Sequence, residues 1–150
     1  CLKQMVAAYE EVGGNIVAAE DVPREDTNKY GILDVDSDDG RLASAHGLVE
    51  KPDPADAPST LSIIGRYILQ PAVFDELERQ ETGAGGEIQL TDAMARTIDR
   101  IPFHGLRFNG TRFDCGNRIG FVEATVAFAL ERDDMRDRML SMLKRISDEN

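Results

Sequence analysis

The sequence predicts an α/β fold, because segments with strand character alternate with segments of helix character along most of its 150 residues. The helical segments repeat apolar residues at intervals of three and four, and the strand segments are short apolar runs that contain β-branched residues. No internal repeat or low-complexity tract interrupts the alternation. A chain of this length forms one domain or a large piece of one, with a sizeable core.

The first fifty residues predict one helix followed by three strands. The helix rests on apolar residues that share one face, and Gly13-Gly14 ends it. These apolar residues are Leu2, Met5, Val6 and Tyr9. Strands are expected at 15–22, 30–35 and 41–50, and the aspartate-rich run DSDDG at 36–40 forms a turn between the last two. The three strands together resemble a hairpin or a meander.

The remaining hundred residues predict two further strands and four helices. The proline-rich segment 52–58 must be a loop. The run LSIIGRYIL at 61–69 is apolar on both faces and so predicts a central strand, and a second strand is expected at 103–108. A helix opened by Pro71 is expected at 72–80, and Thr91 can cap another, in which Leu90, Met94 and Ile98 align. Two more helices follow Gly116, and the last carries a methionine stripe typical of a core or a subunit contact.

Composition excludes several classes of function. Seventeen basic residues against twenty-eight acidic ones give a net charge of −11, so neither a nucleic acid nor an anionic membrane is expected as the main partner. No apolar run approaches the roughly 20 residues that a membrane span needs. Two cysteines, Cys1 and Cys115, cannot build a disulfide framework, which favours a cytoplasmic protein. Because the chain begins with Cys1 and Leu2 already belongs to a helical pattern, we expect an N-terminally truncated piece of a longer polypeptide.

The tripeptide Glu50-Lys51-Pro52 is the first candidate site. It ends a predicted strand, and ligands of α/β proteins bind beyond the carboxyl ends of strands. The lysine can hold a phosphate, and the carboxylate can accept hydrogen bonds from sugar hydroxyls. The alternative is an exposed strand end with two solvated charges.

Two further segments are candidates. Gly31, inside a predicted strand, marks close approach of a ligand or of another backbone, or else a bulge or a packing accommodation. Asp114 lies just before a helix, where it can ligate Mg²⁺ or cap the helix. The neighbouring Cys115 is expected to be a small buried hydrophobe rather than a nucleophile.

Other polar residues are expected to have structural roles. The loop 82–87 (TGAGGE) lacks the lysine of a P-loop, and we expect it to position Glu87 and to start a helix in which Asp92 complements the dipole. His46 and His104 are isolated in the sequence, and the ring nitrogens of each are expected to have partners within the protein rather than to bind a ligand.

The order of six segments resembles the C-terminal half of bacterial UTP–glucose-1-phosphate uridylyltransferases (UDP-glucose pyrophosphorylases). These segments are YGI at 30–32, VEKP at 49–52, APS at 57–59, IGRYIL at 64–69, GAGGEIQLTDA at 83–93 and FDCG at 113–116. The resemblance runs over essentially the whole chain, and GAGGEIQLTDA is its most specific part. The EKP motif alone would also fit other sugar-phosphate nucleotidyltransferases.

The resemblance implies a Rossmann-like nucleotidyltransferase fold, with a mixed, mainly parallel sheet flanked by helices. It also implies uridylyl transfer from UTP to glucose 1-phosphate, giving UDP-glucose and pyrophosphate. By the same resemblance, Gly31 would contact the glucose through its backbone and Glu50 would accept from glucose hydroxyls. Lys51 would pair with the sugar phosphate as the catalytic cation, and Asp114 would help to hold Mg²⁺.

The chain departs from this family in what would precede Cys1. The glycine-rich nucleotide loop and an upstream metal-binding aspartate are absent, so we expect residues 1–150 to be the sugar-binding portion, inactive when isolated. Two alternatives stay open: a noncatalytic fragment that binds sugar phosphate or serves assembly, and a sister enzyme that uses another nucleotide such as dTTP. We expect a homo-oligomer, with the C-terminal helix within 131–150 as a contact.

Overall fold

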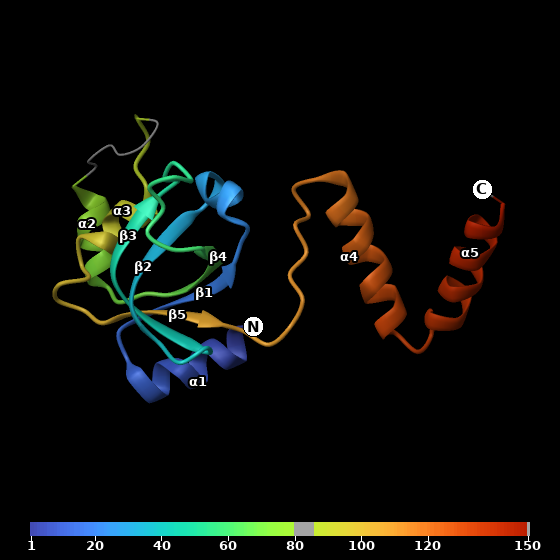
Figure 1. Ribbon diagram of the computed structural model, residues 1–150. Coiled ribbons are helices and arrows are strands. Elements are labelled where there is room, and N and C mark those ends of the chain that lie inside the picture. Colours follow the sequence, from blue (N-terminus) through green and yellow to red (C-terminus); the bar gives the residue numbers. More distant parts are fainter. Residues whose placement is uncertain (80–85, 150) are drawn as a thin grey trace. The chain divides into compact units, whose positions relative to one another are not determined.

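The computed structural model describes residues 1–79 and 86–149, which form two compact units (Figure 1). The first unit spans Cys1–Asn109 and contains all the described strands; the second spans Gly110–Asn150. The strands are β1 (Asn15–Asp21), β2 (Gly31–Asp38), β3 (Leu42–Glu50), β4 (Leu61–Ile68) and β5 (Phe103–Arg107). The helices are α1 (Leu2–Val12), α2 (Ala72–Glu78), α3 (Leu90–Ala95), α4 (Arg118–Glu131) and α5 (Arg136–Asp148), with a 3-10 helix at Arg24–Lys29.

The five strands form a sheet that closes on itself in the order β1-β4-β2-β3-β5. The strand β4 lies between β1 and β2, in line with the central strand predicted at 61–69, although closure gives each of the five described strands two neighbours. The sheet is mixed, as predicted, but it is not mainly parallel: among the described strands only β1 and β5 run parallel, with Asn15 opposite Phe103. A tight turn makes β2 and β3 antiparallel, and β4 also runs antiparallel to both of its neighbours.

The turn between β2 and β3 is shorter than the predicted 36–40, because β2 continues to Asp38. Asp38 pairs with Ala43 across the hairpin. The Asp39 carboxylate accepts hydrogen bonds from the backbone N–H groups of Arg41 (2.7 Å) and Leu42 (2.6 Å), so one aspartate closes the turn. These two bonds favour the ionised carboxylate and lower the pKa of Asp39.

Two hydrophobic clusters hold the first unit together. One contains Val73 of α2 and Met94 of α3 packed against residues from β1 to β5, and Phe103 is its largest fully buried side chain. The other packs Met5 and Ala8 of α1 against the opposite side of the sheet. Figure 1 shows α1 on one side of the strands, with α2 and α3 on the other. The sheet is therefore covered on two sides, as in a layered α/β fold.

The second unit consists of α4 and α5. Asn117 caps α4 by accepting a hydrogen bond from the Gly120 backbone N–H at 2.8 Å. Gly120 is required there, because a Cβ at this position would lie 2.0 Å from the Asp114 carbonyl oxygen. Phe113 and Phe128 pack with ring centroids 6.0 Å apart. Among the helices that the structure describes, none combines the length and apolar character required to cross a membrane.

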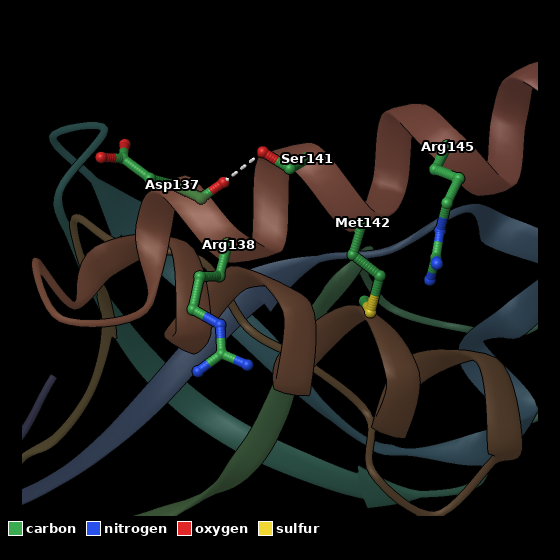
Figure 2. Close-up of a pocket in the computed structure, with 5 residues that line it drawn as sticks. All are labelled: Asp137, Arg138, Ser141, Met142 and Arg145. Carbon is green, nitrogen blue, oxygen red and sulfur yellow. Dashed lines mark hydrogen bonds between the residues drawn. The ribbon is translucent and has the colours of Figure 1, made fainter.

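The face of α5 carries a shallow surface hollow of about 460 Å³ (Figure 2). It is lined by Asp137, Arg138, Ser141, Met142 and Arg145. The Ser141 hydroxyl donates to the Asp137 carbonyl oxygen within the helix at 2.9 Å. Of the predicted methionine stripe, Met135 and Met142 remain exposed and Met139 is half-buried.

Candidate functional site

The predicted residues Gly31, Glu50 and Lys51 lie together at one end of the β2–β3 hairpin. Gly31 begins β2 and Glu50 ends β3, and the two are partners in the antiparallel register. The pairing extends one residue further, since the Lys51 backbone N–H donates to the Tyr30 carbonyl oxygen at 2.9 Å. The hairpin register therefore places the acid and the glycine directly opposite each other.

The two carboxylate oxygens of Glu50 have different neighbours. Oε2 accepts a hydrogen bond from the Thr91 hydroxyl at 2.7 Å, whereas Oε1 lies 3.6 Å from Nζ of Lys51. The Glu50 side chain is 12% exposed. Oε2 is thus held by a hydrogen bond within the protein, whereas Oε1 has only the longer ion-pair contact with Lys51.

Lys51 is poised differently from its neighbour. Its side chain is 53% exposed, and the 3.6 Å separation from Oε1 is an ion pair that is too long for a good hydrogen bond. Its φ of +47° is the left-handed conformation that a residue with a side chain seldom adopts. Such conformations cost free energy and tend to occur at functional sites. The ammonium therefore keeps donors for a ligand.

A side chain at Gly31 would crowd its neighbours. A Cβ built there would lie 3.1 Å from Glu50 Oε2 and 3.1 Å from Thr91 Oγ1. The glycine therefore accommodates the hydrogen bond between the threonine and the glutamate. The atoms that crowd this position belong to side chains, so the structure shows the packing accommodation that was one alternative for Gly31.

Thr91 was expected to cap a helix, and this prediction was wrong. Gln89 occupies the N-cap position of α3 without a side-chain capping hydrogen bond, and Thr91 lies inside the first turn with its hydroxyl directed to Glu50. The cause is tertiary: the end of β3 offers a carboxylate that no local pattern reveals. The only signal in the sequence is that Thr91 belongs to GAGGEIQLTDA, the segment most specific to the family it resembles.

Tyr67 adds a further polar group under the influence of Glu50. It lies on β4 and is 38% exposed. Burial, and to a smaller degree the negative charge of Glu50, raise the pKa of the Tyr67 phenol.

Asp114 belongs to the second unit and is exposed. It does not cap α4 itself but supports the residue that does: its carboxylate accepts from the Gly116 N–H at 3.0 Å and from the Asn117 amide at 3.2 Å. Within residues 1–79 and 86–149, no three His, Cys, Asp or Glu side chains cluster as a metal site would require. A lone carboxylate still fits Mg²⁺ that is bound mostly through substrate phosphates and water.

The remaining predicted residues divide into confirmed and corrected cases. His46 pairs with Asp34 at 3.3 Å, as expected of a satisfied histidine. His104 differs, since its buried Nδ1 has no hydrogen-bond partner among the described residues and burial lowers its pKa. Cys115 is exposed rather than buried, because it lies in the segment that precedes α4.

The acids near α3 make local contacts. Glu87 accepts a hydrogen bond from the Gln89 amide at 3.4 Å, and Asp92 lies in the first turn of α3, as predicted. Residues 82–85 of the glycine-rich loop lie outside the described residues.

Comparison with known proteins extends this description. A family model described as nucleotidyl transferase matches residues 1–130. The chain is 60% identical over 119 residues to a UTP–glucose-1-phosphate uridylyltransferase of Komagataeibacter xylinus, covering 79% of this chain and 42% of that protein. The chain spans about half the length of the curated relatives it matches.

Solved structures agree with the sequence relatives. A UDP-glucose pyrophosphorylase complexed with UDP-glucose is 39% identical with a TM-score of 0.79, covering 87% of this chain and 50% of that one. A UTP-bound UGPase from Acinetobacter baumannii is 32% identical with a TM-score of 0.82, covering 95% and 49%. These similarities confirm the predicted resemblance and the α/β Rossmann-like nucleotidyltransferase fold.

Proposed function

The chain belongs to the nucleotidyl transferase family, and on this premise we propose that it serves uridylyl transfer from UTP to glucose 1-phosphate, giving UDP-glucose and pyrophosphate. Its part is the sugar-phosphate side of the site. The observation that carries the proposal is the pairing of Glu50 with Lys51 at the end of β3, an acceptor for hydroxyls beside a cation for a phosphate.

The reaction requires no covalent bond between the substrates and the protein. A phosphate oxygen of glucose 1-phosphate attacks the α-phosphorus of UTP, and the bond to the pyrophosphate leaving group breaks. The chain's residues align the nucleophile and offset its negative charge. Glu50 accepts from sugar hydroxyls, Gly31 contacts the sugar through its backbone, and Lys51 pairs with the sugar phosphate.

Mg²⁺ is proposed as the cofactor, with Asp114 as the ligand that this chain contributes. A carboxylate oxygen is the donor type that Mg²⁺ prefers, and each oxygen of Asp114 accepts a single hydrogen bond from Gly116 or Asn117, which leaves a lone pair for a cation. The ion would supply charge neutralisation on the phosphates.

Two alternatives compete with this function. A noncatalytic fragment for sugar-phosphate binding or assembly is less favoured, because relatives at 43–60% identity carry the name of the uridylyltransferase. A sister enzyme using dTTP is also less favoured: a structure titled as a putative thymidylyltransferase from Bacillus anthracis is only 22% identical and supports the shared fold alone.

We further propose a cytoplasmic homo-oligomer with residues 131–150 as a contact. The support is the side chains that α5 leaves exposed, namely Leu140, Met142 and Ile146. Light scattering of the wild type and of the variant Leu140→Glu tests the contact: a lower mass for the variant is expected, and equal masses would refute it.

Pyrophosphate release tests the proposed function. The protein at its natural length is supplied with glucose 1-phosphate and Mg²⁺, together with UTP or dTTP. Pyrophosphate is expected with UTP and far less with dTTP. Calorimetric titration of residues 1–150 with glucose 1-phosphate and UDP-glucose, with and without Mg²⁺, then measures what this portion binds by itself. Absence of pyrophosphate release at natural length would refute the enzyme function, and a preference for dTTP would favour the sister enzyme.

A further inference from the structure

Thr91 makes an unusual contact for a helical threonine. It lies in the first turn of α3 and is only 9% exposed, yet its hydroxyl donates to Glu50 Oε2, 41 residues away in the chain, at 2.7 Å. A threonine inside a helix commonly turns its hydroxyl to a carbonyl one turn earlier. Here the hydroxyl points out of the helix toward the end of β3.

We infer that Thr91 is a positioning residue for sugar recognition: it anchors Oε2 of Glu50 so that Oε1 is presented to a hydroxyl of the bound hexose 1-phosphate. The inference rests on the proposed function and adds to it a division of roles between the two oxygens. Thr91 itself touches no substrate in this scheme. It acts through Glu50.

The geometry around Glu50 supports this division. With Oε2 bonded to Thr91, rotation of the carboxylate would break a charge-assisted hydrogen bond that is largely shielded from water. Oε1 is not fixed in this way, because its neighbour Lys51 Nζ lies 3.6 Å away. A donor hydroxyl from a ligand therefore finds one oriented acceptor rather than a rotating group, which lowers the entropy lost on binding.

Gly31 makes the anchor possible from the other side. A Cβ at this position would lie 3.1 Å from Oε2 of Glu50 and 3.1 Å from Oγ1 of Thr91, and so would crowd both atoms of the hydrogen bond. Three elements thus converge on one hydrogen bond: the start of β2, the end of β3 and the first turn of α3.

The side chain of Thr91 allows a matched set of variants. Thr91→Val keeps the shape and removes the hydroxyl, whereas Thr91→Ser keeps the hydroxyl and removes the methyl group. If the hydroxyl acts by orienting Glu50, valine raises the KM for glucose 1-phosphate about tenfold, as expected for a lost hydrogen bond to a charged group. The KM of Thr91→Ser for glucose 1-phosphate stays within about twofold of the wild-type value. The KM for UTP changes little in either variant.

The experiment measures uridylyl transfer by the wild type and both variants at natural length, together with their thermal unfolding. Thr91→Ala replaces Thr91→Val if the valine variant does not fold. Calorimetry with glucose 1-phosphate then compares Thr91→Val in the wild-type background and in a Glu50→Ala background. Because Thr91 acts through Glu50, the substitution is expected to have no further effect once Glu50 is removed.

The outcomes separate this inference from the function on which it rests. Wild-type turnover combined with an unchanged KM for glucose 1-phosphate in Thr91→Val would overturn the inference alone. Equal effects of Thr91→Val with and without Glu50 would also overturn it, since Thr91 would then act independently. No transfer by the wild type would overturn the proposed function, and the inference with it.

Discussion

Gly31 lies directly opposite Glu50 in the β2–β3 pair, and a Cβ on Gly31 would stand 3.1 Å from the Glu50 carboxylate. Gly31→Ala is therefore expected to displace Glu50 and Thr91 and to raise the KM for glucose 1-phosphate. Overpacking of this kind also lowers the free energy of unfolding, by about 1 kcal/mol or more. Steady-state kinetics and urea unfolding measure the two effects.

A second substitution provides the control for Gly31→Ala. The new Cβ would also lie 3.3 Å from the Thr91 methyl carbon, so Gly31→Ala combined with Thr91→Ser removes part of the crowding. The double variant should recover part of the lost affinity. A double variant that is worse than Gly31→Ala would show that crowding is not the cause.

Lys51→Ala is expected to lower turnover at least a hundredfold, because an aligned cation on the sugar phosphate stabilises charge during the transfer. Stability should change by less than about 0.5 kcal/mol, since the Lys51 side chain is half exposed. The matched control is Lys29→Ala, which removes an exposed lysine paired with Asp26. If the turnover of Lys51→Ala stayed within about twofold of the wild-type value, Lys51 would not be the cation that pairs with the sugar phosphate.

Asp114→Asn is expected to raise the Mg²⁺ concentration needed for half-maximal activity, because the amide is a weaker ligand for a hard cation. A Mg²⁺ titration of pyrophosphate release measures this. Asp133→Asn, at an exposed acid of the same unit, is the control. If the two titration curves coincide, Asp114 serves only to hold Gly116 and Asn117.

Arg107→Met should lower the unfolding free energy by about 1 kcal/mol at pH 7, because the guanidinium links Asp21 on β1 (2.6 Å) with Asp38 on β2 (2.9 Å). Its hydrogen bond is the main cause that lowers the pKa of Asp21 below 3.8. A lowered carboxylate pKa stabilises the fold above about pH 4, and that contribution is lost as the pH falls through the folded-state pKa.

Urea unfolding at pH 7, 5 and 3 therefore has a defined expected pattern. The difference between the wild type and Arg107→Met should be constant at pH 7 and 5 and smaller at pH 3. Arg66→Met, which removes an exposed arginine of β4, should show little difference at any pH. If the difference in unfolding free energy between the wild type and Arg107→Met were larger at pH 3 than at pH 7, the ion pair with Asp21 would not be its cause.

Most secondary structure could be predicted from sequence because its signals are local. The apolar run at 61–69 predicts a strand, and β4 forms at Leu61–Ile68. The hairpin and the adjacency of Gly31 and Glu50 also follow from nearby residues, since a tight turn determines the pairing.

What could not be predicted depends on residues distant in sequence. The hydroxyl of Thr91 finds its acceptor on β3 only after α3 packs there, so a capping pattern was the stronger local signal. The same is true of the sheet's closure: nothing within 103–107 reveals that this strand pairs with both β1 and β3.

The closure of the sheet by β5 has a consequence for biosynthesis. Until residue 107 has left the ribosome, β1 and β3 each lack one neighbour and expose unpaired backbone groups. The sheet of the first unit therefore cannot close until β5 has been synthesised. Pairing of β5 is expected to be slow, because it lies some ninety residues from β1 and some sixty from β3 in the chain. Truncations ending before β5 should accumulate as aggregates, whereas those ending soon after Asn109 retain every strand of the sheet.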